Sequence, residues 1–149
     1  MSGAVAENGW VGSLDAYTLH PIGVVRSELV DRANAPRQGD EGAPDATIEV
    51  MPAVRAGLDG IQEGQELIVV TWLHEAERDV LEVHPRDDVN RPLAGVFGTR
   101  SSDRPNPIGL HRVTVRAVDG GRLRVGPLEA IDGTPVLDIK PVLRGPSQR

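Results

Sequence analysis

One short stretch of the chain combines residue types that suit an anionic or zwitterionic ligand. Residues 98–112 read GTRSSDRPNPIGLHR, with arginines at 100, 104 and 112 and a proline on each side of Asn106. Proline fixes the backbone before any ligand arrives, and the planar guanidinium matches carboxylates and phosphates. The pattern predicts a stiff cationic loop that binds such a ligand, although a turn with solvated charges fits the same residues.

A second candidate is the carboxylate of Asp138, which lies in the apolar run VLDI. A carboxylate in such a run is costly to bury unless it is paired. We expect its partner to be an arginine or a backbone group elsewhere in the chain, and both a catalytic role and an internal ion pair stay open. Lys140 is the only lysine among 16 basic residues, and lysine and arginine are not equivalent at a demanding position.

The histidines at positions 20, 74, 84 and 111 match no helical metal motif. His74 and His84 end neighbouring predicted strands, but a metal would need a third ligand, and we expect no metal site. We expect His111 to point outward from its strand. The absence of cysteine excludes disulfides and thiolate chemistry.

These residues must be positioned by short strands. Strand patterns cover residues 17–28, 46–51, 66–74, 79–84, 110–118, 122–125, 128–131 and 134–139, with a short glycine-bounded segment at 94–99. Residues 29–45 are a polar loop, and residues 52–58 predict one or two helical turns that begin with proline. Closely spaced turns and little helical periodicity predict a mostly β fold, either a barrel or a sandwich.

Length and composition indicate one globular domain. The chain has 149 residues, of which 39% are hydrophobic and 26% charged. The longest apolar run, residues 67–70, is too short to span a bilayer, and the N-terminus lacks the features of a signal peptide. We therefore expect a cytoplasmic protein with a flexible leader at 1–17, a domain at 18–143 and a frayed tail at 144–149.

The charge is distributed unevenly. The net charge is −6, with −10 over residues 1–99 and +4 over residues 100–149. The total argues against non-specific nucleic-acid binding, so any positive surface comes from the second part. Arg122 and Arg124 have the spacing that puts two side chains on one face of a strand, and they predict either a cationic binding surface or a solvated hairpin face.

Two longer motifs resemble a known family. They are GVFGTRSSDRPNPIGL at 95–110 and DGTPVLDIKP at 132–141, accompanied by IGVVRS at 22–27, PRQ at 36–38, WLH at 72–74 and ERDVLEVHPR at 77–86. Over roughly residues 20–143 the chain is similar to the TsaA-like (TrmO) family of S-adenosylmethionine-dependent methyltransferases. The resemblance implies a small single-domain β-barrel with short or few helices.

The resemblance also implies a homodimer, with the cofactor S-adenosylmethionine bound near the subunit interface. Characterised members methylate N6-threonylcarbamoyladenosine next to the anticodon of tRNA. The positions that match cofactor contacts are Pro36, Arg37, Gln38, His74, Glu75, Arg100, Leu110, Glu129, Ala130, Ile131 and Asp132.

Each of these residue types suits one part of the cofactor. An arginine can hold its carboxylate, Leu110 can pack on the adenine, and Asp132 can accept from a hydroxyl or amino group. Methyl transfer mainly requires alignment of donor and acceptor. Asp138 is the candidate base for the acceptor nitrogen, with Lys140 as a second candidate catalytic residue.

Three departures from the family pattern leave other functions open. Val142 follows IKP where the family commonly has tyrosine, and Gly98 stands where it often has alanine. The chain also stops soon after the last motif, where longer bacterial members continue into a C-terminal domain. A methyltransferase for a small molecule, or a module that binds the cofactor without turnover, therefore stays possible.

Overall fold

The computed structural model describes residues 15–37 and 39–145, which form two compact units. The larger unit contains residues 20–73 and 109–145, apart from residue 38, and the smaller contains residues 74–108 together with 15–19. The predicted leader and tail fall mostly outside the described residues, and the predicted domain boundaries stay a prediction.

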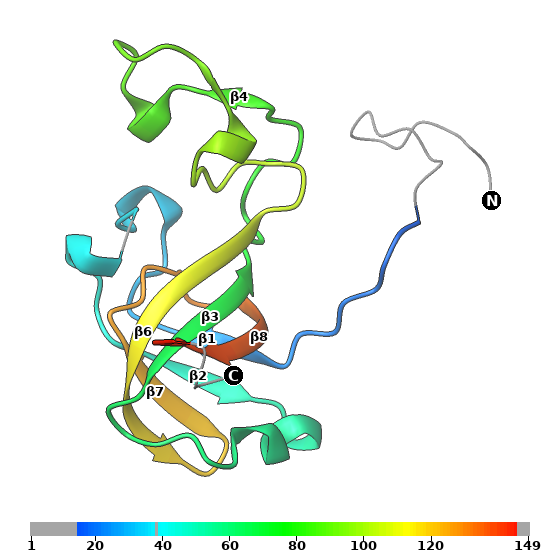
Figure 1. The fold of residues 1–149 in the computed structure, drawn as a ribbon, viewed down its shortest axis with the longest axis vertical. Coiled ribbons are helices and arrows are strands. Elements are labelled where there is room, and N and C mark those ends of the chain that lie inside the picture. The colour runs from blue at the N-terminus through cyan, green and yellow to red at the C-terminus, as the bar shows by residue number, and fades with distance from the viewer. Residues whose placement is uncertain (1–14, 38, 146–149) are drawn as a thin grey trace. The chain divides into compact units, whose positions relative to one another are not determined.

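The larger unit is a closed six-stranded barrel with the strand order β1-β2-β7-β6-β3-β8 (Figure 1). Its last strand, β8, pairs antiparallel with both β1 and β3 and so closes the barrel. The prediction of a mostly β barrel is confirmed, and the sandwich alternative is excluded. The strands are β1 (Gly23–Arg26), β2 (Ala46–Val50), β3 (Glu66–Trp72), β6 (Ile108–Asp119), β7 (Arg122–Gly126) and β8 (Pro135–Pro141).

Alternate side chains of the strands fill the barrel interior. In β3 every second residue is buried, so Leu67, Val69 and Thr71 face inward. Strands β2 and β7 show the same alternation, as expected when successive side chains point to opposite faces of a sheet. The buried core consists of Val25, Ala46, Ile48, Val50, Leu58, Leu67, Val69, Val113, Val115, Leu123, Val125, Leu128, Ala130 and Val136.

Two register shifts interrupt the ladders, one between Val70 and Thr71 of β3 and one between Val115 and Ala117 of β6. A bulge bends its strand and increases the local twist. Both effects help a sheet of short strands to close on itself.

The described helices are short 3-10 turns. They are η1 (Arg32–Asn34), η2 (Gly39–Glu41), η3 (Pro52–Leu58), η4 (Pro85–Asp87) and η5 (Val96–Gly98). η3 begins with Pro52, as predicted, and its one buried residue is Leu58, which joins the core.

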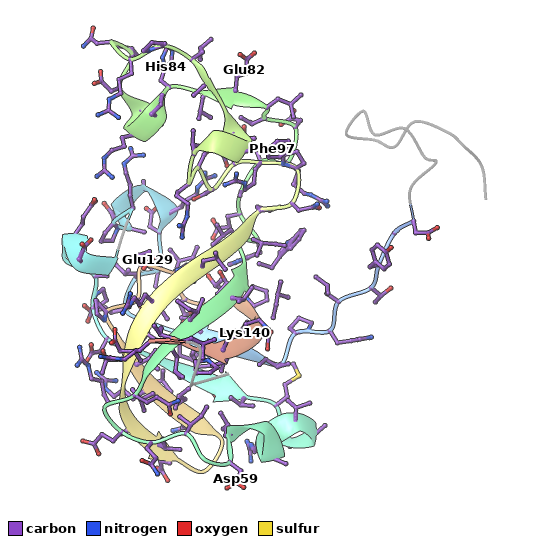
Figure 2. All side chains as sticks on the ribbon, in the orientation of Figure 1. Asp59, Glu82, His84, Phe97, Glu129 and Lys140 are labelled. Carbon is purple, nitrogen blue, oxygen red and sulfur yellow. The ribbon has the colours of Figure 1, made fainter. Side chains whose placement is uncertain are left out.

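The smaller unit is built around a two-stranded sheet of β4 (Glu82–Val83) and β5 (Ala94–Gly95). Val96, Pro105 and Pro107 are the buried apolar residues of this unit. Figure 2 labels Phe97, which is 80% exposed, and Glu82 and His84 on the same unit. Of the strands predicted at 79–84 and 94–99, only the two-residue strands β4 and β5 are present.

Two other strand predictions need correction. The strand predicted at 17–28 is limited to β1, and Tyr17 is 85% exposed. The strand predicted at 128–131 is wrong, because these residues form a loop. Pro127 has no amide hydrogen to continue a ladder, and the amide of Leu128 donates to the carbonyl of Pro44 instead.

An ion-pair cluster lies at the start of β3. Glu66 accepts a hydrogen bond from Nε of Arg112 at 2.9 Å and another from Arg144. The hydrogen bond from Arg112 is the main cause that lowers the pKa of Glu66. Desolvation opposes it, and the charges of Arg112 and Arg144 reinforce it.

We expect this cluster to stabilise the barrel in a pH-dependent way. The pKa of Glu66 is lowered in the folded protein. Its contribution to the free energy of unfolding is therefore fully present above the ordinary glutamate pKa and is lost as the pH falls through the lowered pKa. Glu66→Gln should slightly lower the thermal midpoint at about pH 7 and have no effect at about pH 2. Calorimetry on both proteins checks this, and a difference that does not change with pH would contradict it.

Candidate functional site

The arginine-rich loop of the smaller unit is held together by one of its own arginines. Nη1 of Arg104 donates to the carbonyls of Thr99 and Ser101, each at 3.1 Å. Nη2 donates to the carbonyl of Val96 at 2.5 Å, and the Arg104 amide donates to the carbonyl of Glu77. Arg104 therefore has a structural role that the sequence analysis did not separate from ligand binding.

Arg78 holds the proline-rich end of the same loop. Its Nε donates to the Pro105 carbonyl at 2.7 Å, and its Nη2 donates to Oδ1 of Asn106 at 3.1 Å. Pro105 and Pro107 are both buried. The stiff loop predicted from the prolines is thus also fixed by side-chain hydrogen bonds.

Arg100 differs from both of these arginines. It is exposed, and it makes no hydrogen bond or ion pair with any residue that the structure describes. The loop therefore holds one guanidinium out to solvent on a backbone that Arg104 and Arg78 fix. A planar cation held in this way suits a carboxylate or a phosphate.

The second candidate segment is the loop at 127–134 in the barrel unit. The amide of Asp132 donates to the Leu29 carbonyl at 2.6 Å, and Oδ1 of Asp132 accepts from the Ser27 amide at 3.0 Å. Oδ2 of Asp132 lies 4.0 Å from Nη1 of Arg26. These contacts tie the loop to β1 and to the polar segment that follows it.

Side chains within this loop face different ways. Ala130 and Ile131 are only 4% and 8% exposed, so contacts between these two residues and a ligand would come chiefly from their backbone. The Asp132 side chain is 38% exposed and keeps acceptor capacity on Oδ2. Glu129 also belongs to the barrel unit (Figure 2) and points its carboxylate at a buried histidine.

That histidine contradicts a prediction. His111 is 4% exposed, and its Nδ1 lies 2.5 Å from Oε1 of Glu129. Its Nε2 lies 2.6 Å from Oγ1 of Thr71, which is fully buried. The prediction that His111 points outward is wrong, because it shares the inward face of β6 with the core residue Val113.

The remaining predicted contact positions that the structure describes lie on exposed segments. Leu110 is 49% exposed on β6, and Pro36 and Arg37 follow η1. Gln38 lies outside the described residues. In the smaller unit, Nε2 of His74 lies 3.8 Å from Oε2 of Glu75.

The structure also corrects the expected partner of Asp138. Oδ2 of Asp138 lies 2.9 Å from Nζ of Lys140, and the two side chains are 50% and 68% exposed. The two residues are two positions apart on β8, so they share the face opposite Ile139, which packs against the core. The expectation of a partner elsewhere in the chain is wrong, and the pair lies on the outer surface instead of inside the barrel.

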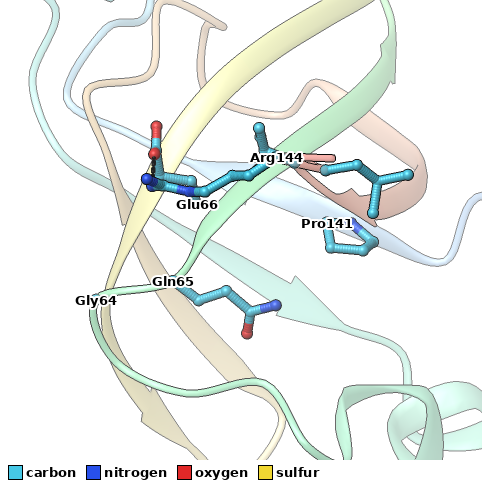
Figure 3. A pocket seen from close by; sticks show the side chains of 7 residues that line it. Gly64, Gln65, Glu66, Pro141 and Arg144 are labelled. Carbon is cyan, nitrogen blue, oxygen red and sulfur yellow. Dashed lines mark hydrogen bonds and ion pairs between the residues drawn. The ribbon is translucent and has the colours of Figure 1, made fainter. Parts of the chain in front are cut away.

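A cavity of about 410 Å³ lies elsewhere, between the start of β3 and the segment after β8 (Figure 3). Its charged lining groups, Glu66 and Arg144, are paired with each other. It lies at the opposite end of β8 from Asp132 and contains none of the predicted contact positions. Its lining residues are Gly64, Gln65, Glu66, Pro141, Val142, Leu143 and Arg144.

Within the barrel unit, the structure brings the loop at 127–134 together with Ser27, Leu29 and Pro44. His74, Glu75 and Arg100 belong to the smaller unit. Sequence reasoning missed the buried roles of Thr71 and His111, although the alternation of His111 with Val113 carried that signal. No group of three histidine, cysteine, aspartate or glutamate residues that could hold a metal occurs at positions 15–37 or 39–145.

The fold and site define a small closed β-barrel whose candidate ligand-binding side chains lie mainly in ordered loops. The family model described as tRNA-methyltransferase O N-terminal domain matches residues 24–145. The chain belongs to this family, which confirms the resemblance seen in the motifs. No helix among the described residues has the length and hydropathy that crossing a membrane requires.

Relatives and solved structures support the same assignment. The chain is 44% identical over 123 residues to the "Probable S-adenosyl-L-methionine-binding protein" of Methanothermobacter thermautotrophicus, covering 83% of this chain and 88% of that one. It is 43% identical over 122 residues to the "S-adenosyl-L-methionine-binding protein" of Archaeoglobus fulgidus, covering 82% and 86%.

The crystal structure of TrmO from Pseudomonas aeruginosa matches with a TM-score of 0.70 and 29% identity. The match covers 87% of this chain and 57% of that one. The chain therefore spans little more than half the length of this solved TrmO structure.

The motif glycine Gly109 generates a prediction about stability. A Cβ there would lie 2.6 Å from Oγ1 of Thr71 and 2.7 Å from Nε2 of His111. Gly109→Ala should therefore force these side chains apart and destabilise the fold by about 1–3 kcal/mol, measured by urea unfolding. Gly98→Ala is the matched control, because a Cβ at Gly98 meets nothing within 4 Å. Equal unfolding midpoints for the two variants would contradict the close contact.

Proposed function

We propose that this chain is an S-adenosylmethionine-dependent methyltransferase that acts on N6-threonylcarbamoyladenosine in tRNA. The observation that carries the proposal is the family match over residues 24–145. Relatives that share about 44% of their residues with the chain are named for binding S-adenosylmethionine. A solved relative is named TrmO.

The side chains of the described loops fit this cofactor chemically. S-adenosylmethionine carries a carboxylate, an ammonium group and an adenosine, and its sulfonium supplies an activated methyl group. Arg100 is exposed and suits the carboxylate. The half-exposed Leu110 offers an apolar contact for the adenine, and Oδ2 of Asp132 can accept a hydrogen bond.

Other positions complete the proposed contacts. Pro36, Arg37 and Gln38 would contribute from the segment after β1, and His74 and Glu75 from the segment after β3. The buried side chains of Ala130 and Ile131 leave their backbone groups for hydrogen bonds with the ligand. The loops at 99–106 and 127–134 are held by internal hydrogen bonds, so ordering these two loops adds little to the cost of binding.

The protein's role in the transfer is to align the acceptor and to remove a proton from it. We propose Asp138 as the group that accepts this proton, with Lys140 holding its carboxylate at 2.9 Å. Asp138→Asn should then lower the rate of transfer while leaving cofactor affinity unchanged. A variant with the wild-type rate would remove Asp138 from the mechanism.

Two macromolecular partners belong to the proposal. One is a second copy of the chain, and light scattering that finds only a 16.0 kDa species would exclude it. The other is tRNA, for which Arg122 and Arg124 offer charge on the outer face of β7. Both are exposed, and their side chains make no hydrogen bond or ion pair with the residues that the structure describes.

The experiment that tests the function is transfer of a tritiated methyl group from S-adenosylmethionine. We expect label in total tRNA and none in a metabolite extract. Label only in the extract would support a small-molecule acceptor, and cofactor binding without label in either would indicate a binding module. A control tRNA that lacks the threonylcarbamoyl group should stay unlabelled.

A second prediction concerns the exposed arginine of the smaller unit. Arg100→Ala should weaken binding of S-adenosylmethionine by roughly ten- to a hundred-fold, because a charge-assisted hydrogen bond contributes about 1.5–3 kcal/mol. Calorimetry on the folded variant measures this, and an unchanged dissociation constant would remove Arg100 from the site.

The matched control reverses two other exposed arginines, in the double variant Arg122→Glu/Arg124→Glu. Cofactor affinity should stay unchanged, while binding to tRNA should weaken and lose part of its salt dependence. If this variant methylates tRNA normally at both low and moderate salt, the outer face of β7 is not the RNA-binding surface.

A further inference from the structure

A hydrogen-bonded network of three side chains, Thr71, His111 and Glu129, crosses the barrel interior beside the loop at 127–134. It runs from Oγ1 of Thr71 to Nε2 of His111 over 2.6 Å, and from Nδ1 of His111 to Oε1 of Glu129 over 2.5 Å. Thr71 is fully buried, His111 is 4% exposed, and the Glu129 side chain is 14% exposed. The network joins β3 and β6 to the loop at 127–134, which carries candidate cofactor contacts.

His111 uses both ring nitrogens in these hydrogen bonds. A proton on Nδ1 lets the ring donate to the carboxylate oxygen of Glu129. Nε2 is hydrogen-bonded to the hydroxyl of Thr71, which can act as donor or acceptor. Both ring nitrogens of His111 and the hydroxyl of Thr71 are thereby hydrogen-bonded within the network.

Glu129 uses only one of its two carboxylate oxygens in this way. His111 is its one partner among the residues that the structure describes. In the same part of the chain, no fully buried side-chain nitrogen or oxygen lacks a hydrogen-bond partner. Oε2 of Glu129 is therefore not fully buried, and it keeps its capacity to accept a hydrogen bond.

Stability alone does not explain this arrangement. A buried carboxylate–histidine pair is weak evidence for stability, because an apolar replacement of similar volume is often neutral or stabilising. The hydrophobic core is built from valine, leucine, isoleucine and alanine, and the other buried polar residue, Thr134, donates to the carbonyl of Ile131. The backbone at Gly109 also packs directly against the network, since a Cβ at this position would clash with the side chains of Thr71 and His111.

We propose that Thr71 and His111 are positioning residues that fix the carboxylate of Glu129. The second oxygen, Oε2, is thereby held ready to accept a hydrogen bond from a hydroxyl or ammonium group of the bound cofactor. This inference rests on the proposed function, because Glu129 occupies a position that the family resemblance assigns to cofactor binding. It adds two buried residues that do not themselves contact the ligand.

Two conservative variants of His111 separate the effects of its two hydrogen bonds, one to Glu129 and one to Thr71. The amide of asparagine can take the place of Nδ1 and so keep the hydrogen bond to Glu129. The longer glutamine places its amide near Nε2 and keeps only the hydrogen bond to Thr71. A purely structural histidine would not distinguish between these two replacements.

The experiment measures binding of S-adenosylhomocysteine to the full chain by calorimetry. His111→Gln and Glu129→Gln should each weaken binding roughly ten-fold, and the double variant should be no weaker than either single one. His111→Asn should stay within about three-fold of the wild type. The same series with 5′-methylthioadenosine, which lacks the ammonium group, shows whether Oε2 accepts from the ribose or from the ammonium.

Val113→Ala is the matched control, since Val113 is the next inward residue of β6 and belongs to the core. It should lower the unfolding midpoint and leave the dissociation constant of the folded protein unchanged. Equal weakening by the asparagine and glutamine variants, or by Val113→Ala, would overturn the positioning role. Wild-type affinity in His111→Gln would overturn this inference alone, whereas a wild-type chain that does not bind S-adenosylhomocysteine would overturn the proposed function as well.

Discussion

Closure of the barrel by β8 is the constraint on which the other features of the larger unit depend. β8 pairs with β1 along Gly23 and Val24 and with β3 along Leu67 to Thr71. Once the sheet is closed, one face of every strand must point into a dry interior, and a slip of one residue would turn its apolar side chains outward. Closure therefore also determines that Thr71 and His111 face each other inside.

The same closure orders the loop that precedes β8. Because β8 begins next to β1, the loop at 127–134 lies against the segment that follows β1, and the hydrogen bonds from Leu128 to Pro44 and from Asp132 to Leu29 join them. In the smaller unit, Arg104 and Arg78 order the arginine-rich loop by similar side-chain contacts with backbone carbonyls. Each unit therefore has one candidate ligand-binding loop whose backbone is held by internal hydrogen bonds, which favours binding.

Much of the fold could be predicted from the sequence, because alternation of apolar residues and turn signals are local properties. The strands around 46–51, 66–74, 110–118 and 122–125 were predicted on this basis and are present. The segment at 128–131 has the composition of a strand, yet Leu128 bonds to Pro44, and the next residue after the segment, Asp132, bonds to Leu29. Both partners are distant in sequence. Such a partner cannot be seen in the segment itself.

The candidate site was less accessible to sequence reasoning for a related reason. Arg100 and Arg104 look equivalent in the motif, and only the carbonyls around Arg104 show that it is structural. The inward direction of His111 depends on which face of β6 meets the core, and the Asp138–Lys140 pair depends on their sharing one face of β8. These are properties of the assembled barrel.

We propose that S-adenosylmethionine binds at the motif loops and not at the cavity between β3 and the segment after β8. Hydrogen–deuterium exchange with and without S-adenosylhomocysteine distinguishes these two locations. We expect slower exchange in peptides covering residues 127–134 and 96–104, and unchanged exchange in peptides covering residues 64–66 and 141–144, which line the cavity. Protection of the cavity segments, with the motif loops unchanged, would contradict it.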